Sequence, residues 1–447
     1  MTSREPIVLH EHKSIVKDSA DIKEYLEKHN VRLEGMPDEY MGTPKYLGID
    51  ETLTASYFIG ASWLVENKLS VVVLPKIENI DFLDMFMTAL SVDTNNEKNY
   101  FSKCYGIDFN APPIETKEDI SQLTPLLLVH FLKLLDVLVS KGLKKDYVTI
   151  TENLKNKIKG HIVLSQQIKK NIIPKRVNRN VCTYQIYTED IPVNRLLKKA
   201  LIFANNMLLR LLPSNKNTTK LKALVNNIMP YFNDVSDVIQ ISEVKQCYGN
   251  KLFKSYVETV KVAKDILRRF DYSLTNIGAE NRNTPCFWID MSRLFELYVY
   301  SRLSEIYGEN IKFQVSGYQR TAADYIHVGE HIIMDAKYKQ RYDRSFSGIL
   351  PDIREMSGYA RDYKILKHFG NDFLKSNDEV KCLIIYPQDA YRDAMEGTVD
   401  GGTEEEFLDM TNMSELTYGT SLWSQGTDVR YFRNFRKLKV SHPIINK

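Results

Sequence analysis

The sequence predicts an α+β protein of more than one domain, on three observations. The chain has 447 residues, more than one ordinary hydrophobic core accommodates. Hydrophobic residues make up 43% and charged residues 26%, which is the composition of a globular protein. The spacing of apolar residues also changes along the chain. We therefore expect an N-terminal α+β domain at 1–115, a basic, mostly helical middle region at 116–280, and a C-terminal α/β domain at 285–447.

The N-terminal region reads as two strands and a helix. The segments YFIGASWLV and KLSVVVLPKI are rich in β-branched and aromatic residues, and Asn67 lies between them. Apolar residues at helical spacing follow at 80–91. Ala111, Pro112 and Pro113 mark a plausible end of this domain.

The middle region shows apolar residues at helical spacing in three stretches, 121–141, 192–212 and 251–270. Between the first two lies a basic segment, 155–190, with a predicted strand in VCTYQIYT. The most apolar stretch, 123–139, is interrupted by charged residues and is shorter than a membrane span requires. We interpret it as a buried amphipathic helix, and we expect no membrane partner.

Charge is distributed unevenly along the chain. Residues 1–120 hold 12 Lys and Arg against 21 Asp and Glu, whereas residues 141–270 hold 25 against 9. Such a basic block indicates contact with a polyanion, usually nucleic acid, although a lysine-rich solvated helix face would look the same. The five cysteines form no CxxC pair, and the N-terminus has no apolar signal segment. These features favour a reducing, cytoplasmic location.

The C-terminal region alternates helices and strands. The predicted elements are a helix at 290–307, strands at 311–315, 323–328 and 331–339, a helix at 351–367 and a strand at 380–387. An acidic, glycine-containing stretch at 393–409 is expected to be a surface loop.

The stretch TAADYIHVGEHIIMDAKYK (321–339) is the strongest functional signal. Gly329 and Glu330 separate two apolar-alternating runs, which predicts a hairpin with a type II′ turn. In that register Asp324 lies opposite Asp335, with Cβ atoms roughly 4.5–5.5 Å apart. Lys337 lies two residues beyond Asp335 and projects from the same face.

Facing carboxylates repel each other, so a divalent cation between them is expected, and oxygen ligands suit Mg²⁺. Lys337 could then orient or deprotonate an attacking water and stabilise charge on a phosphate. The alternative is an exposed hairpin in which Asp335 forms a salt bridge with Lys337. Apolar Ile326 and Ile333 on the same face favour the catalytic interpretation.

Three further residues are candidates for the same site. Glu296, in the helix that precedes the first strand, is a candidate third metal ligand, or else a surface residue near Arg293. Glu355 and Tyr359 lie one helical turn apart and face the same direction. They could brace the lysine or the water, or form an ordinary helix pair.

Several segments together resemble McrC, the nuclease subunit of the McrBC modified-cytosine restriction systems, within the PD-(D/E)xK superfamily. The resemblance covers about residues 45–390. Its segments are LSVVVLPKIENIDFLDMF (69–86), KGHIVLSQQIKKN (159–171), VCTYQIYTEDIPVNRLLKKAL (181–201), LFELYVYSRL (294–303), ADYIHV and IIMDAKYK (323–339), and DIREMSGYA (352–360). Two departures stand out. Ala323 replaces the usual proline before the first acid, and Glu355 stands where related nucleases carry glutamine, adding a negative charge.

The resemblance implies a restriction-endonuclease-like C-terminal core and a Mg²⁺-dependent DNA endonuclease. Asp324, Asp335 and Glu296 would hold the metal, and Lys337 would assist the water. It also implies a McrB-like AAA+ GTPase partner, which this chain would stimulate. The sequence contains no GxxxxGK[ST] phosphate loop, so the GTPase is expected on another chain, docked on the acidic N-terminal region. The alternatives are a non-catalytic DNA-binding adaptor of a motor and a stand-alone RecB- or Cas4-like repair nuclease.

Overall fold

The structure is a computed structural model. The residues that it describes are 6–15, 19–35, 44–77, 80, 82–90, 100, 103–108, 111–112, 114–116, 123–211, 216–244, 254–274, 282–284, 286–318, 321–339, 346–376, 378–387, 419–429 and 431–440. The predicted acidic loop at 393–409 lies outside these residues. Within them, no helix is both long and apolar enough to cross a membrane.

The chain divides into two compact units. The first contains Met1–Ile120 and Glu280–Lys447, and the second contains Ser121–Ala279. The second unit nearly coincides with the predicted middle region, whereas the predicted first and third regions fall together in the first unit. The reason is a strand, β10 (Cys286–Asp290), that follows the second unit in sequence but pairs with β2 and β4 of the N-terminal sheet.

The N-terminal sheet has five strands. Their order is β1 (Ile7–His10), β3 (Leu69–Leu74), β2 (Phe58–Val65), β10 and β4 (Tyr105–Asp108). β1 and β3 run parallel, and the other neighbours are antiparallel. Two helical segments, α1 (Ser19–Lys28) and η1 (Lys45–Gly48), contribute Leu26 and Leu47 to the core of this sheet. The predicted strands on either side of Asn67 are confirmed.

The second sheet of the first unit has six strands. Their order is β11 (Ile311–Ser316), β12 (Ala322–His327), β13 (Ile332–Ala336), β14 (Lys381–Pro387), β16 (Phe435–Val440) and β15 (Thr427–Asp428). β11, β12 and β13 are antiparallel, whereas β13, β14 and β16 are parallel. The four strands predicted in this region are confirmed, although β13 ends at Ala336 and the chain at 337–339 is not a strand.

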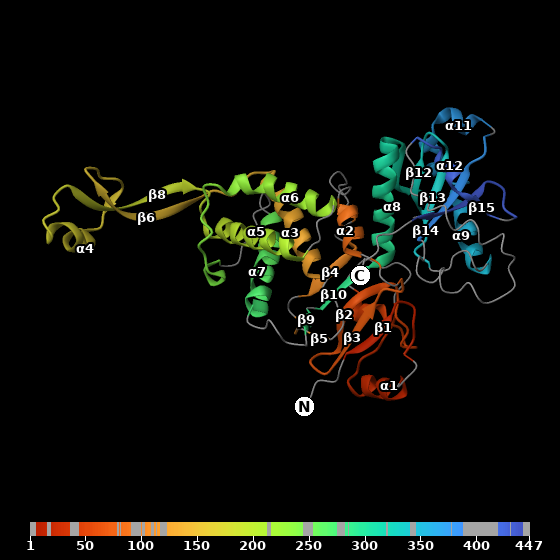
Figure 1. Ribbon diagram of the computed structural model, residues 1–447, viewed down its shortest axis with the longest axis horizontal. Helices are drawn as coiled ribbons and strands as arrows, with labels where there is room; N and C mark the ends of the chain where they lie inside the picture. The colour runs from red at the N-terminus through yellow and green to blue at the C-terminus, as the bar shows by residue number, and fades with distance from the viewer. Residues whose placement is uncertain are drawn as a thin grey trace. The chain divides into compact units, whose positions relative to one another are not determined.

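Helices cover this sheet. One face carries Ile326, Ile333 and Ile384, which pack in one buried cluster with Ile353 and Met356 of α9 (Phe346–Tyr359). The alternate face carries Tyr325, whose hydroxyl donates a hydrogen bond to the backbone oxygen of Glu296 in α8 (Met291–Tyr307). Figure 1 shows α8 beside this sheet. The N-terminal α2 (Phe82–Leu90) also packs on α8.

The predicted helix at 351–367 is two helices. α9 begins earlier, at Phe346, and ends at Tyr359, and α10 (Tyr363–Leu366) begins after Asp362. The Asp362 carboxylate accepts hydrogen bonds from the backbone N–H groups of Lys364 and Ile365, which caps a new helix and explains the break. The remaining short elements of this unit are β5 (Ile114–Thr116), β9 (Arg282–Thr284), η8 (Gly308–Asn310), η10 (Lys367–Phe369), α11 (Asn371–Lys375) and α12 (Leu422–Gln425).

The second unit has a helical part and a long hairpin. The helical elements are α3 (Leu123–Val139), α5 (Pro192–Leu211), α6 (Lys216–Ile228), η5 (Met229–Phe232), η6 (Ile241–Glu243) and α7 (Lys254–Leu274). Fully buried Leu132, Leu196 and Ala263 belong to α3, α5 and α7, which pack on one another. The three helices predicted here are confirmed, and α3 is the predicted buried apolar helix.

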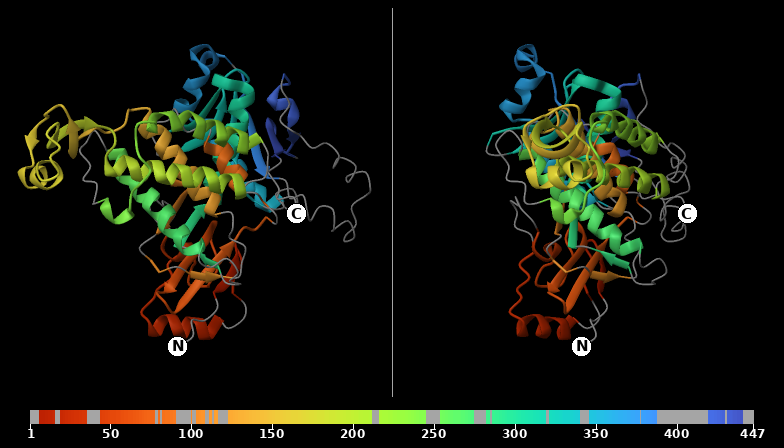
Figure 2. Two further views of the ribbon diagram at one scale, coloured as in Figure 1. Left: turned by 60° about the vertical axis from the view of Figure 1, so that its left-hand side comes forward. Right: turned by 90° about the vertical axis from the view of Figure 1, so that its left-hand side faces the viewer.

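The hairpin pairs β6 (Asp146–Lys155) with β8 (Arg179–Thr188) over ten residues, and β7 (His161–Ile162) adds a short third strand. Two helical segments, α4 (Leu164–Gln167) and η4 (Ile168–Ile172), complete its end. Figures 1 and 2 show this hairpin extending away from the helices of its own unit. We call residues 146–188 the basic arm, because eight Lys and Arg accompany two Asp and Glu there.

Candidate active site

The hairpin of β12 and β13 carries the two predicted acids. Ile326 pairs with Ile333, so the predicted register is confirmed. The same register brings Asp324 opposite Asp335 at the end of the hairpin remote from its turn. Apolar side chains on the acids' face are buried, which agrees with the prediction that this face is not simply solvated.

The predicted type II′ turn of this hairpin is wrong. The turn spans residues 328–331, and its left-handed residue is His331 (φ 54°) rather than Gly329. The left-handed conformation of His331, at the last turn position, returns the chain to β13 in the same register that a type II′ turn would give. The turn type therefore differs from the prediction, while the strand pairing does not.

Asp324 is a half-buried carboxyl with partners on both neighbouring strands. Its Oδ2 accepts a hydrogen bond from the backbone N–H of Ala336 at 2.9 Å. Its Oδ1 accepts one from Nε2 of Gln314 at 3.2 Å. Loss of solvation, and then the charge of Glu296, raises the pKa of Asp324 to about 7. Near neutral pH this carboxyl is therefore close to the midpoint of its ionisation.

Lys337 links Asp335 to helix α9. Its Nζ lies 2.7 Å from Oδ2 of buried Asp335 and 2.9 Å from Oε2 of exposed Glu355. Burial opposes the positive charge of Lys337, but the two carboxylates outweigh it and raise the lysine pKa. The hydroxyl of Tyr359 donates to Oε1 of Glu355 at 2.7 Å. The predicted bracing pair, Glu355 and Tyr359, thus lies against the lysine.

Glu296 joins the same group from α8. Its Oε2 accepts hydrogen bonds from the hydroxyl of Tyr100 at 3.1 Å and from Nε2 of Gln314 at 3.4 Å. Loss of solvation, followed by the charges of Asp290 and Asp335, raises the pKa of Glu296 to about 8. All six residues predicted for the site therefore lie in one connected network.

Sequence reasoning missed Gln314 and Tyr100. Gln314 has a left-handed backbone (φ 50°) inside β11, a conformation that is costly for a residue with a side chain and recurs at functional sites. Its amide reaches both Glu296 and Asp324. The segment IKFQV alternates apolar and polar residues, so a polar residue at 314 is ordinary for a strand and gave no signal. Tyr100 is 196 positions from Glu296, and no local pattern indicates that contact.

Comparison with known proteins identifies the family. Residues 54–365, well over half of the chain, match the family described as "McrBC 5-methylcytosine restriction system component". The chain belongs to this McrBC family. The resemblance predicted from the sequence is therefore confirmed at the level of the family, and the match includes the candidate site from Glu296 to Tyr359.

Two solved structures also resemble this McrBC protein. One is described as "Refined half-complex from tetradecameric assembly of Thermococcus gammatolerans McrB AAA+ hexamers with bound McrC". It covers 98% of this chain and 94% of its own, at 17% identity and a TM-score of 0.36. The other, "Cryo-EM structure of the Thermococcus gammatolerans McrBC complex", covers 67% and 87%, at 17% identity and a TM-score of 0.29. At these TM-scores the assignment rests on the family match. No curated protein matches the sequence significantly.

The acids of this McrBC protein fit a hard divalent cation by their chemistry. Burial raises the pKa of Glu296, Asp324 and Asp335 first of all, and the charge of another acid in the group raises each of them further. A cation among these oxygens would relieve that repulsion. In the described ranges, however, no three His, Cys, Asp or Glu side chains already converge as a formed metal site.

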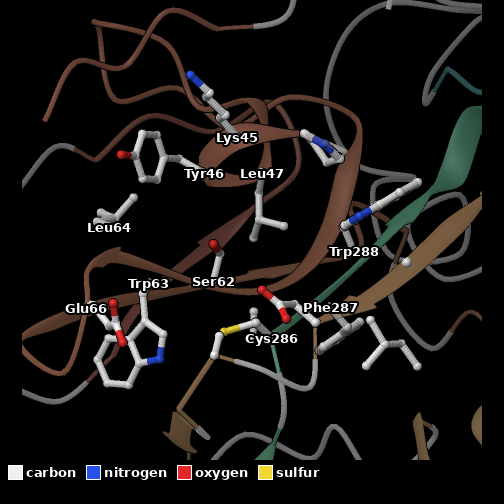
Figure 3. Close-up of a pocket in the computed structure, with 16 residues that line it drawn as sticks. Lys45, Tyr46, Leu47, Ser62, Trp63, Leu64, Glu66, Cys286, Phe287 and Trp288 are labelled. Atoms are coloured by element: carbon white, nitrogen blue, oxygen red, sulfur yellow. The ribbon is translucent and has the colours of Figure 1, made fainter. Parts of the chain in front are cut away.

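A separate pocket of about 800 Å³ lies at the N-terminal sheet and contains none of the predicted site residues. Figure 3 shows Tyr46, Ser62 and Trp288 among its lining side chains. Tyr46 and Leu47 both have left-handed backbones there, with φ of 50° and 56°. This pocket is therefore distinct from the carboxylate network of the candidate active site.

Proposed function

We propose that this McrBC-family chain is the DNA-cutting subunit of its restriction complex, and that β11–β14 with α8 and α9 form a PD-(D/E)xK core. One observation carries the proposal. A hairpin inside a covered sheet brings Asp324, Asp335 and Lys337 together. Lys337 contacts Glu355 of α9, and the charge of Glu296 of α8 acts on Asp324. Acids and a lysine that are grouped in this way suit phosphodiester hydrolysis better than a solvated salt bridge.

Asp324, Asp335 and Glu296 are the residues that would hold Mg²⁺. The bound ion would polarise a phosphate oxygen and lower the pKa of a water. Gln314 donates to Asp324 and to Glu296, so it orients both carboxyls. Tyr100 donates to Glu296 and holds that carboxyl from the other side.

Lys337 acts through its charge. The carboxylates of Asp335 and Glu355 raise its pKa, so the ammonium remains protonated at neutral pH. A permanently protonated lysine cannot accept the proton of the attacking water. Of the roles predicted for it, orienting the water and stabilising negative charge on the phosphate are therefore better supported than deprotonating the water. Glu355 fixes the ammonium from α9.

The proposed partners are DNA and a McrB-like AAA+ GTPase. The titles of the two similar structures describe McrB hexamers with bound McrC and a McrBC complex. The sequence of this chain lacks a phosphate loop of the GxxxxGK[ST] type. We propose that the GTPase lies on the partner, that this chain stimulates it, and that the acidic N-terminal region is the docking surface.

The test is a cleavage assay with the purified chain, modified-cytosine DNA and Mg²⁺, with and without a McrB-type GTPase and GTP. We expect poor cutting by the chain alone and GTP-dependent cutting by the pair. Strong cutting without the partner and GTP would instead support the stand-alone repair nuclease. Stimulated GTP hydrolysis without any cutting would support the non-catalytic adaptor.

A further inference from the structure

The N-terminal sheet ends in a charged pair next to the candidate active site. Glu11 follows β1, and Lys76 lies just beyond β3, so both come from the carboxyl ends of two parallel strands. Glu11 is 1% exposed, and its Oε2 accepts a hydrogen bond from the backbone N–H of Lys76 at 2.9 Å. Its Oε1 is buried and has no hydrogen-bond partner among the described residues.

Both members of this pair contact Tyr338, the residue after Lys337. Nζ of Lys76 donates to the backbone oxygen of Tyr338 at 2.6 Å and lies 4.0 Å from the centre of its ring. The hydroxyl of Tyr338 donates to Oε2 of Glu11 at 3.4 Å. The Tyr338 side chain is 5% exposed and packs beside Phe295 of α8.

These contacts hold the backbone that carries Lys337. β13 ends at Ala336, and the N–H of Lys337 still donates to the oxygen of Ile385 in β14 at 2.8 Å. Beyond that bond the chain leaves the sheet. The Tyr338 carbonyl bound by Lys76 is therefore one anchor on the far side of Lys337, and the ion pair of Lys339 with Asp352 is another.

We propose that Lys76, oriented by Glu11, is a positioning residue for Lys337, so that the N-terminal sheet sets the place of the ammonium in the active site. The inference rests on the proposed nuclease function. Misplacing a reacting group by about 1 Å can cost a factor of about 10² in rate. The charge of Lys76 acts on the buried Glu11 carboxyl. Buried opposite charges are by themselves weak grounds for stability, so the contacts of both residues with Tyr338 point to a more specific role.

The experiment is a double-mutant cycle in the full chain, assayed with a McrB-type GTPase, GTP and Mg²⁺. One change is the double substitution Glu11→Gln with Lys76→Met, which removes both charges together and leaves no buried carboxylate unpaired. The other is Lys337→Met. The control is Lys13→Met, an exposed lysine of the same N-terminal region. Thermal melts verify that each variant is folded.

We expect the Glu11 and Lys76 change to lower kcat by about tenfold to a hundredfold, with KM for DNA unchanged. In the Lys337→Met background the same change should have no further effect, because the residue that it positions is gone. An unchanged kcat in the parent background would overturn the inference. An equal loss in both backgrounds would also overturn it, since that pattern belongs to a general structural role.

A smaller change covers the case in which the double substitution prevents folding. Glu11→Gln alone keeps the shape of the carboxyl and removes the charge that attracts Lys76. We expect a loss of kcat of about threefold, again absent in the Lys337→Met background, and additive losses would contradict the inference. Failure of the proposed function is distinguishable, because the parent would then cut no DNA, or Lys337→Met would cut as fast as the parent.

Discussion

Two antiparallel hairpins of this chain, β12–β13 and β6–β8, have the same kind of backbone pairing and very different surroundings. In β12–β13, Tyr325 and Ile333 are 0% exposed, and Asp335 is 3% exposed. In β6–β8, the facing residues Tyr147 and Tyr187 are 66% and 62% exposed. The first hairpin lies inside a six-stranded sheet between helices, whereas the second, among the described residues, pairs with no strand except the two-residue β7.

The contrast shows how surroundings decide what a charged side chain does. Charges in the covered hairpin interact strongly, because little solvent screens them, and several of the carboxyl pKa values are far from their usual range. Charges on the basic arm are screened by water and salt and act mainly by attracting an oppositely charged partner. The covered hairpin is therefore suited to chemistry, and the exposed one to recognition.

The largest expected effect concerns the covered hairpin. Lys337→Ala and Asp335→Asn should each lower cleavage by about 10²–10³. Lys337→Ala should leave Mg²⁺ binding in place, whereas Asp335→Asn should weaken it, because a charged ligand becomes neutral. Asp335→Asn also removes repulsion from Asp324, so metal-free stability should stay level or rise slightly. Cleavage assays with the motor and thermal melts with and without Mg²⁺ measure these effects.

If Asp335 merely formed a structural pair with Lys337, neither substitution would change cleavage. Unchanged cutting by both variants would remove the nuclease assignment from this hairpin and favour the adaptor. The covered hairpin would then have no catalytic role, in spite of its buried charges.

A smaller effect is expected from the exposed hairpin. Replacing Lys157, Lys159, Lys169 and Lys170 by glutamine should lower DNA affinity about tenfold, with a shallower salt dependence. The slope of log K against log salt should shrink by about 0.9 for each lost phosphate contact. Binding titrations at several salt concentrations measure both. The control replaces four exposed N-terminal lysines, Lys13, Lys23, Lys28 and Lys68.

Unchanged DNA affinity together with lost binding to the motor would assign the basic arm to a protein partner instead. Several large apolar side chains on the arm are exposed among its lysines, including Leu164 at 71% and Val177 at 96%. Lower DNA affinity would mean that the basic arm binds DNA, and lost binding to the motor would mean that it binds the motor. The salt titration distinguishes the two.

The smallest effect is a dependence of stability on pH. Burial raises the pKa of Glu296 to about 8 from its ordinary value of 4.5. A raised carboxyl pKa means that the folded state binds a proton that the unfolded state has already lost. Without metal, this group therefore favours folding at pH below about 4.5, and the contribution is lost progressively as pH rises toward about 8. Tm in EDTA should fall between pH 6 and pH 8.

Glu296→Gln should flatten that fall, because the amide does not titrate. Other raised carboxyls, such as Asp324, contribute in the same direction, so the variant should keep part of the trend. Thermal melts of the parent and of Glu296→Gln at pH 6 and pH 8 measure how much of the change in Tm is due to Glu296. A parallel pH dependence in both proteins would contradict the assignment of this shift to Glu296.

Local sequence pattern was sufficient for the covered hairpin and for the longer helices. The alternation of apolar residues around Ile326 and Ile333 fixed the register by counting from the turn, even though His331 rather than Gly329 takes the left-handed conformation. Register depends on the number of turn residues, whereas turn type depends on one backbone angle that several residues can adopt.

Contacts between distant segments could not be predicted in this way. Lys76 and Tyr338 are 262 positions apart, and nothing in either neighbourhood indicates the other. Residues 286–290 fall within the predicted C-terminal domain, where the sequence pattern predicts no strand, yet they form β10, which pairs with β2 and β4. Pairing of this kind is decided by which strand edges remain open, which a single sequence does not display.

The place of β10 in the N-terminal sheet has a consequence for synthesis of the chain on the ribosome. β2 and β4 are complete by residue 108, but the strand that joins them begins at Cys286, after the whole second unit. At roughly 5–20 residues per second, that interval lasts on the order of ten seconds or more. The contiguous second unit can fold during this interval, but the edges of β2 and β4 that pair with β10 remain unpaired. Open edges invite pairing with other chains, so the nascent polypeptide is the form of this protein most in need of a chaperone.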